Sequence, residues 1–266
     1  MSPNKHIKVL FIGDIIGAYG RKITEELLPE LMRELSPDFI LANGENSAHG
    51  YGITLKIYTA LMDMGIDGLA MGNHMFDKKE LGREIAKFEN MVKPANYPPA
   101  APGKEFLIIE KDGVKLGLLN LLGRTFMAAM DCPFRAADRV VEVIKKETNN
   151  IIVDMHAEAT SEKVAMGFYL EGRVSAVLGT HTHVMTADDR VLPGGTSYIS
   201  DVGMVGSQDS VIGMKRDAIL KRFLTGLPER FEPAEEGPGT LNAVLVTIDS
   251  KTGHASKIKR ITKLLS

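Results

Sequence analysis

The sequence predicts an α/β protein in which helices pack on a sheet, and two observations support this prediction. Short apolar runs with the length of buried strands recur along the 266 residues, and amphipathic helical patterns separate several of them. In addition, residues 110–113 (EKDG) lie between two apolar runs and are typical of a hairpin turn. We therefore expect that part of the sheet is antiparallel.

The expected strands are rich in aliphatic and β-branched residues, and most are followed by glycine or a polar residue. They cover residues 8–14, 39–46, 68–74, 114–123, 150–156, 174–181, 196–203 and 241–249. The expected helices cover residues 21–35, 54–65, 78–88, 135–147 and 215–224. Pro29 lies inside the first helical pattern, where its ring should start a new turn or kink the helix.

The organisation of the chain points to one domain over residues 1–266. The stretch 227–240 resembles a loop, but the residues that follow it are too few for a second domain. We find no internal repeat.

Composition excludes several classes of protein. The formal net charge is −2, and no aromatic-rich basic strand is present, which argues against RNA recognition as the main role. No apolar stretch approaches the roughly 20 residues of a membrane helix, so we expect no membrane partner. Cys132 is the single cysteine, which excludes an intramolecular disulfide. With no signal-peptide pattern at the N-terminus, these features favour a cytoplasmic protein in which Cys132 is a structural thiol.

Polar side chains follow five of the expected strands. They are Asp14, Glu45 with Asn46, Asn73 with His74, His156, and His181 with His183. Ligand sites in α/β sheets form beyond the carboxyl ends of strands, so these side chains should meet at one edge. Taken singly, each is more often a turn former, a helix cap or a structural histidine. The set as a whole predicts a metal site, and a strand would point His181 and His183 in the same direction.

The chemistry of this set indicates which ions it could bind. Carboxylate, amide oxygen and imidazole suit zinc, manganese or iron, and no thiolate suggests a structural zinc site. One ion would leave donors over, whereas two ions that share Glu45 would use them all. Asp14 and Glu45 offset only part of the charge of two divalent ions, so the site should attract an anionic phosphate ester.

The order of these motifs resembles that of the calcineurin-like metallophosphoesterases. They read GD (13–14), NGEN (43–46), GNH (72–74), MH (155–156) and GTHTH (179–183). Two departures stand out: Ile16 replaces the histidine of the common D-x-H opening, and Glu45 stands where an aspartate usually bridges the metals. These departures, together with FIGDIIGAYGR, NGENSAHGYGIT and DMHAEATSEK, resemble the YmdB-like bacterial phosphodiesterases over essentially the whole chain.

The resemblance implies a four-layer α/β/β/α sandwich with mixed sheets and two metal ions, most often iron, with manganese or zinc as alternatives. One ion would bind Asp14, Glu45, Asn46 and His183, and the other would bind Glu45, Asn73, His156 and His181. His74 would donate a proton without binding metal, after a metal-bridging hydroxide attacks phosphorus. The implied substrates are 2′,3′-cyclic nucleotides, with 3′,5′-cyclic nucleotides and RNA ends as further candidates. Related proteins suggest a homo-oligomer.

Four further residues have open roles. Arg124 could bind phosphate or lie at the surface, and His49 could reach phosphate or bond only to backbone. Asp154 shares its side of the strand with His156 and could orient that imidazole, or be an ordinary buried partner. Asp201 is a similar candidate.

Other functions remain alternatives at this point. The same metals could serve a phosphomonoesterase or nucleotidase. An amidohydrolase-type enzyme carries H-x-H on its first strand, whereas here the motif comes late. A non-catalytic metal-binding regulatory protein would not need the proton donor that His74 is expected to be.

Overall fold

The computed structural model describes residues 6–265 and contains two mixed β-sheets. In spatial order, the first has β13 (Ala255–Leu265), β12 (Gly239–Asp249), β11 (Met204–Ser207), β1 (His6–Ile15), β2 (Phe39–Asn43), β3 (Gly68–Ala70) and β4 (Met91–Val92). The second has β5 (Phe106–Lys111), β6 (Val114–Leu122), β7 (Ile151–His156), β8 (Ala176–Thr180), β10 (Ser197–Ile199) and β9 (Arg190–Val191). The expected antiparallel hairpin is confirmed, since Lys111 of β5 pairs with Val114 of β6.

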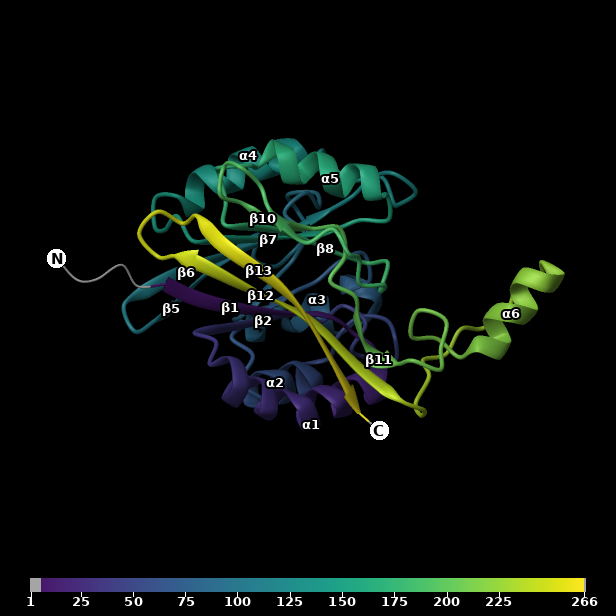
Figure 1. The fold of residues 1–266 in the computed structure, drawn as a ribbon. Coiled ribbons are helices and arrows are strands. Elements are labelled where there is room, and N and C mark those ends of the chain that lie inside the picture. Colours follow the sequence, from purple (N-terminus) through teal and green to yellow (C-terminus); the bar gives the residue numbers. More distant parts are fainter. Residues whose placement is uncertain (1–5, 266) are drawn as a thin grey trace.

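The two sheets pack face to face, and helices cover their outer faces (Figure 1). Helices α1 (Gly17–Leu35) and α2 (Leu55–Asp63) cover the first sheet, while α4 (Pro133–Ile144) and α5 (Thr160–Tyr169) cover the second. Strand β1 shows why its sequence is continuously apolar: Val9 and Phe11 face the other sheet, and Leu10 and Ile12 face the helices. The predicted four-layer sandwich is confirmed.

The elements differ from the sequence prediction in several places. Helix α5 and the short strands β4, β9 and β11 were not expected. Helix α1 begins four residues early and continues through Pro29 to Leu35. The expected helix 78–88 is wrong: it is interrupted into α3 (Leu81–Glu84) and a 3₁₀ turn (Ile85–Lys87). Gly82 lies inside α3, where a glycine weakens a helix. Strand β13 was not expected, because its apolar residues Ile258, Ile261 and Leu264 recur every three residues and not every two.

Residues 208–238, here called the arm, connect β11 to β12 and project from the body of the molecule (Figure 1). The arm carries α6 (Arg216–Thr225), in which only Ile219 is buried. Phe223 and Leu224 of α6 are 82% and 84% exposed. None of the helices among residues 6–265 has the length and apolar character that a membrane crossing requires.

Candidate metal centre

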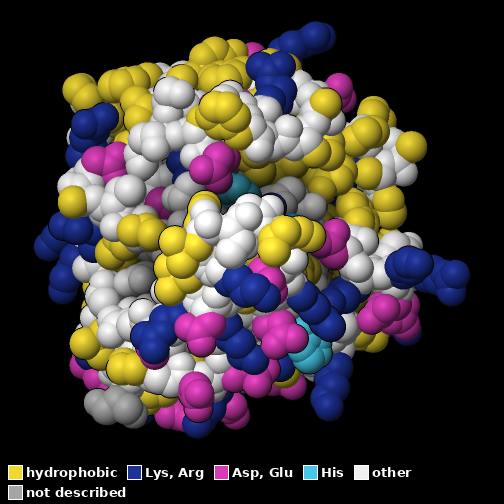
Figure 2. All heavy atoms as spheres, turned by 90° about the vertical axis from the view of Figure 1, so that its right-hand side faces the viewer, with side chains coloured by type: hydrophobic (Ala, Val, Ile, Leu, Met, Phe, Trp, Pro, Cys, Tyr) yellow, Lys and Arg dark blue, Asp and Glu magenta, His cyan; other side chains and the backbone are white. Residues whose placement is uncertain are grey.

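The expected ligands meet where the carboxyl ends of both sheets lie side by side. The first sheet supplies Asp14 from β1, Glu45 and Asn46 after β2, and Asn73 after β3; the second supplies His156 at the end of β7, and His181 and His183 after β8. Figure 2 shows a histidine at the bottom of a hollow in this face. The site therefore crosses the boundary between the sheets.

One group of donor atoms surrounds His156. Its Nε2 lies 2.9 Å from Glu45 Oε1, 3.1 Å from Asn73 Oδ1 and 3.1 Å from His181 Nδ1. Gly72 makes this approach possible, since a Cβ at this position would lie 2.3 Å from Glu45 Oε2 and 2.5 Å from His156 Nε2. These four side chains are the ones expected to share an ion.

A second group contains buried oxygens that lack partners. Asp14 Oδ1 and Asn46 Oδ1 are buried and accept no hydrogen bond. The Asn46 amide is fixed by its own Nδ2, which donates to the Gly50 carbonyl at 2.9 Å. His183 Nε2 lies 3.9 Å from Asp14 Oδ1. Buried oxygens without partners are costly, and a cation bound here would satisfy both. This donor set therefore fits a metal ion.

A hydrogen-bonded chain behind His156 fixes its orientation. His156 Nδ1 donates to Thr180 Oγ1 at 2.8 Å, and the Thr180 hydroxyl donates to Asp154 Oδ1 at 2.6 Å. Asn43 Nδ2 donates to the other oxygen of Asp154 at 2.9 Å. With Nδ1 occupied, Nε2 is the atom that faces the donor group. Asp154 thus lies where the sequence placed it, on the same side of β7 as His156.

The two histidines after β8 point to the site for a different reason from the one expected. Strand β8 ends at Thr180, so His181 and His183 lie on a loop, and both adopt positive φ angles (95° and 65°). Strand alternation is therefore the wrong explanation for their shared direction. Between them, Thr182 donates through its backbone N–H (3.1 Å) and its hydroxyl (2.7 Å) to Asp201 Oδ2.

Asp201 is itself held by a buried lysine. Lys163 Nζ lies 2.8 Å from Asp201 Oδ2, with both side chains nearly inaccessible. The other carboxylate oxygen accepts from the Gly203 N–H at 2.8 Å. This ion pair therefore anchors the loop that carries both histidines. Asp201 was a candidate from the sequence, whereas Lys163 was not, because no helix was expected at residues 160–169.

The outer nitrogens of the two loop histidines also have partners. His181 Nε2 lies 3.2 Å from Glu158 Oε2, which leaves Nδ1 toward His156. His183 Nδ1 donates to the Ile212 carbonyl at 2.8 Å, which leaves Nε2 toward Asp14. The second of these contacts comes from the arm, and no side-chain pattern could have predicted a backbone carbonyl.

His74 lies beside the donor groups without joining them. Its backbone N–H donates to Glu45 Oε2 at 2.9 Å, and its ring Nδ1 lies 2.8 Å from Asp77 Oδ2. The Tyr51 ring packs edge-on at 4.8 Å between centroids. Asp77 fixes one nitrogen of the ring, so Nε2 remains to exchange a proton. Asp77 was missed, although its spacing of three from His74 on a turn was a readable signal.

Electrostatics in the metal-free site centre on His156 and Glu45. Burial alone would lower the pKa of His156, but Glu45, Asp14 and Asp154 outweigh it and raise the pKa to about 9. Burial would raise the pKa of Glu45, but His156 outweighs it and the pKa falls to about 2. Burial lowers the pKa of His181 to about 3 and raises that of Asp154 to about 7. The pair His156–Glu45 is thus charged without metal.

Metal uptake should therefore release a proton. The neutral imidazole is the ligand, and His156 keeps its proton up to a pKa of about 9 in the metal-free protein. We expect Mn²⁺ affinity to rise roughly tenfold per pH unit between about pH 6 and about pH 8, with about one proton released per His156. Calorimetric titration in buffers of different ionisation enthalpy measures both quantities. Equal affinity at both pH values with no proton release would contradict this assignment.

The donor groups open into a cavity of about 620 Å³ whose lining includes Glu45, His74 and several arm residues. Arg124 and His49 are both exposed on loops and are not part of this lining. The Arg124 backbone N–H donates to the Glu162 carboxylate at 3.0 Å. A role for either side chain in substrate binding stays a prediction.

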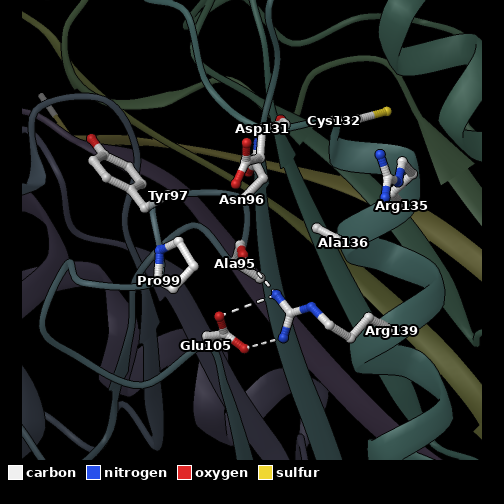
Figure 3. Close-up of a pocket in the computed structure, with 10 residues that line it drawn as sticks. All are labelled: Ala95, Asn96, Tyr97, Pro99, Glu105, Asp131, Cys132, Arg135, Ala136 and Arg139. Carbon is white, nitrogen blue, oxygen red and sulfur yellow. Dashed lines mark hydrogen bonds and ion pairs between the residues drawn. The ribbon is translucent and has the colours of Figure 1, made fainter.

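A second cavity of about 560 Å³ lies at the start of α4 and holds none of the expected ligands (Figure 3). Arg139 and Glu105 point toward each other across it and form an ion pair. Cys132, the residue before α4, lines this cavity as a free, half-buried thiol. None of the residues expected to bind metal lines this cavity.

Comparisons with known proteins show the family of the chain. Residues 10–261 match the family model described as YmdB-like protein. The chain is 50% identical over 255 residues to the 2′,3′-cyclic-nucleotide 2′-phosphodiesterase of Bacillus subtilis, which covers 96% of each chain. A Thermus thermophilus protein described as hypothetical superposes with a TM-score of 0.91 at 41% identity, over 98% of this chain and 100% of the other. A Mycoplasma pneumoniae phosphatase superposes with a TM-score of 0.91 at 33% identity, over 98% and 94%. The chain therefore belongs to the YmdB-like protein family.

Proposed function

We propose that the protein is a metal-dependent phosphodiesterase that opens 2′,3′-cyclic nucleotides to 3′-nucleotides. The observation that carries the proposal is that Glu45, Asn73 and His181 converge on His156, beside the buried Oδ1 atoms of Asp14 and Asn46 that lack partners. One ion would bind Asp14, Glu45, Asn46 and His183, where two buried oxygens lack partners. The other would bind Glu45, Asn73, His156 and His181. The activity named for the Bacillus subtilis relative supports the same reaction. Iron is our first choice of metal, with manganese or zinc as alternatives.

The reaction adds water across one phosphodiester bond. When bound, two divalent ions would lower the pKa of a water molecule and offset the charge of the phosphoryl group. The water oxygen forms a bond to phosphorus, the bond from phosphorus to the ribose 2′ oxygen breaks, and the 3′-phosphate remains. His74 supplies the proton that the leaving 2′ oxygen takes up. Asp77 holds the opposite nitrogen of the ring, at 2.8 Å, and keeps the imidazole in place.

The proposal extends to further substrates, to the cellular location and to the oligomeric state. 3′,5′-Cyclic nucleotides and RNA ends present similar phosphodiesters and are further candidates. Phosphomonoesters are the main alternative on the same ligands. We also propose a cytoplasmic homo-oligomer.

Activity assays with counted metal test the proposal. Metal-free, iron-, manganese- and zinc-loaded protein would be offered 2′,3′-cyclic AMP, 3′,5′-cyclic AMP and p-nitrophenyl phosphate. We expect two metal ions per chain and the highest kcat/KM for the 2′,3′-cyclic diester. Preference for p-nitrophenyl phosphate would favour the phosphomonoesterase alternative. Metal-loaded protein that hydrolyses none of the three would favour a non-catalytic regulatory role.

A further inference from the structure

The cavity beside the metal ligands has two chemically different sides. One side is polar and carries Glu45, His74 and His181. The other comes from the arm and includes Met214, Arg222, Phe223 and Phe231. In Figure 2, hydrophobic side chains gather along one side of the hollow that contains the histidine. At about 620 Å³, the cavity has a volume within the range of small-molecule sites.

The arm side presents aromatic rings that are open to the cavity. Phe223 is 82% exposed although it lines the cavity, so its ring is hardly covered by protein. The Arg222 guanidinium lies over the Phe231 ring at 5.0 Å from its centroid. Phenylalanine faces and guanidinium planes are the groups on which proteins stack nucleobases.

Hydrogen bonds hold this aromatic side at a fixed place relative to the ligands. The Ile212 carbonyl accepts the His183 Nδ1 proton at 2.8 Å, which joins the arm to an expected metal ligand. The arm is closed on itself by the Lys215 N–H, which donates to the Glu232 carbonyl at 2.8 Å, and by the Ala234 N–H, which donates to the Gly213 carbonyl at 2.9 Å. These bonds fix the base of the arm beside the ligands, and Phe231 directly precedes the bonded residue Glu232.

We propose that Phe223 and Phe231 form the nucleobase subsite of the cavity. The base stacks on these rings while the cyclic phosphate lies at the metal ligands; this assignment rests on the proposed function. The arm residues of the cavity lining carry no amide or carboxylate side chain. The subsite therefore binds the faces of a base and should accept different bases.

Substrates with and without a base test the proposal. We expect Phe223→Ala and Phe223→Leu to lower kcat/KM for 2′,3′-cyclic AMP roughly 5- to 100-fold. The same variants should hydrolyse the base-free methyl riboside 2′,3′-cyclic phosphate as the unchanged protein does. Phe231→Leu should act in the same direction while keeping apolar volume. Phe168→Ala is the matched control, since Phe168 is another exposed phenylalanine (55%) outside the cavity lining.

Binding measurements separate this inference from the proposed function. The affinity of manganese-loaded protein for 3′-AMP should fall in the Phe223 variants, while its affinity for inorganic phosphate stays the same. If the protein hydrolyses no cyclic nucleotide but the Phe223 variants lose affinity for 3′-AMP alone, the proposed function is wrong and the nucleobase subsite is supported. The subsite proposal is wrong if the Phe223 variants lose as much kcat/KM with the base-free substrate, or lose none with either substrate. It is also wrong if Phe223→Ala changes the sedimentation coefficient. The last outcome would assign Phe223 to an interface between copies.

Discussion

Replacing His74 by alanine is expected to lower kcat for 2′,3′-cyclic AMP by about 10²- to 10⁴-fold, with the metal content per chain unchanged. The reason is that the ribose oxygen is a poor leaving group without a proton, and His74 is the residue proposed to supply one. Its ring contacts Asp77 and Tyr51, while its backbone N–H, which the substitution keeps, donates to Glu45. The loss should therefore be one of proton transfer.

The leaving group provides the decisive control for this experiment. A diester with a p-nitrophenolate leaving group needs little protonation, so His74→Ala should retain most of its activity on bis-p-nitrophenyl phosphate. Asp77→Asn should lose less activity than His74→Ala, because it disturbs only the orientation of the ring. Similar losses on both substrates, or loss of metal from His74→Ala, would show that His74 serves the structure of the site.

Replacing Lys163 by methionine should lower the free energy of unfolding by about 3–5 kcal/mol, because it leaves the buried Asp201 carboxylate without its cation. The two groups lie 2.8 Å apart, with 2% and 1% of their side chains exposed. Urea denaturation of the metal-free protein measures the change. The double variant Lys163→Met/Asp201→Asn should recover part of the loss, since no charge then remains buried.

A surface ion pair serves as the comparison for Lys163. Lys115 and Glu147 are 2.7 Å apart but well exposed, so Lys115→Met should hardly change unfolding. Lys163→Met should also weaken metal binding, because Asp201 holds Thr182 between the two loop histidines. If Lys163→Met and Lys115→Met change the free energy of unfolding by the same amount, the buried ion pair does not anchor the loop.

The sequence predicts the chemistry of the site better than it predicts the supporting contacts. Asp14, Glu45 and His156 could be found because strand ends leave a signal in hydrophobic patterning. Lys163 could not, because α5, which carries it, was not expected, and only the fold brings this lysine to Asp201. The Ile212 carbonyl has no sequence signal at all. The bounds predicted for the helix at residues 78–88 were wrong, because helix propensity is a weak preference that tertiary packing overrides. The single-domain organisation stays a prediction.

The expected ligands come from both sheets, so residues that never touch a substrate influence the geometry of the site. Asp14 and Glu45 are attached to the first sheet, whereas His156 and His183 are attached to the second. Side chains such as Phe11 and Leu118 fill the core between the two sheets. The thickness of this core therefore determines the distance between the expected ligands of the first sheet and those of the second. Tight packing between the sheets therefore sets the distance between the expected ligands. A bound ion would in turn connect the two sheets. Metal binding and the stability of the folded protein would therefore be thermodynamically linked.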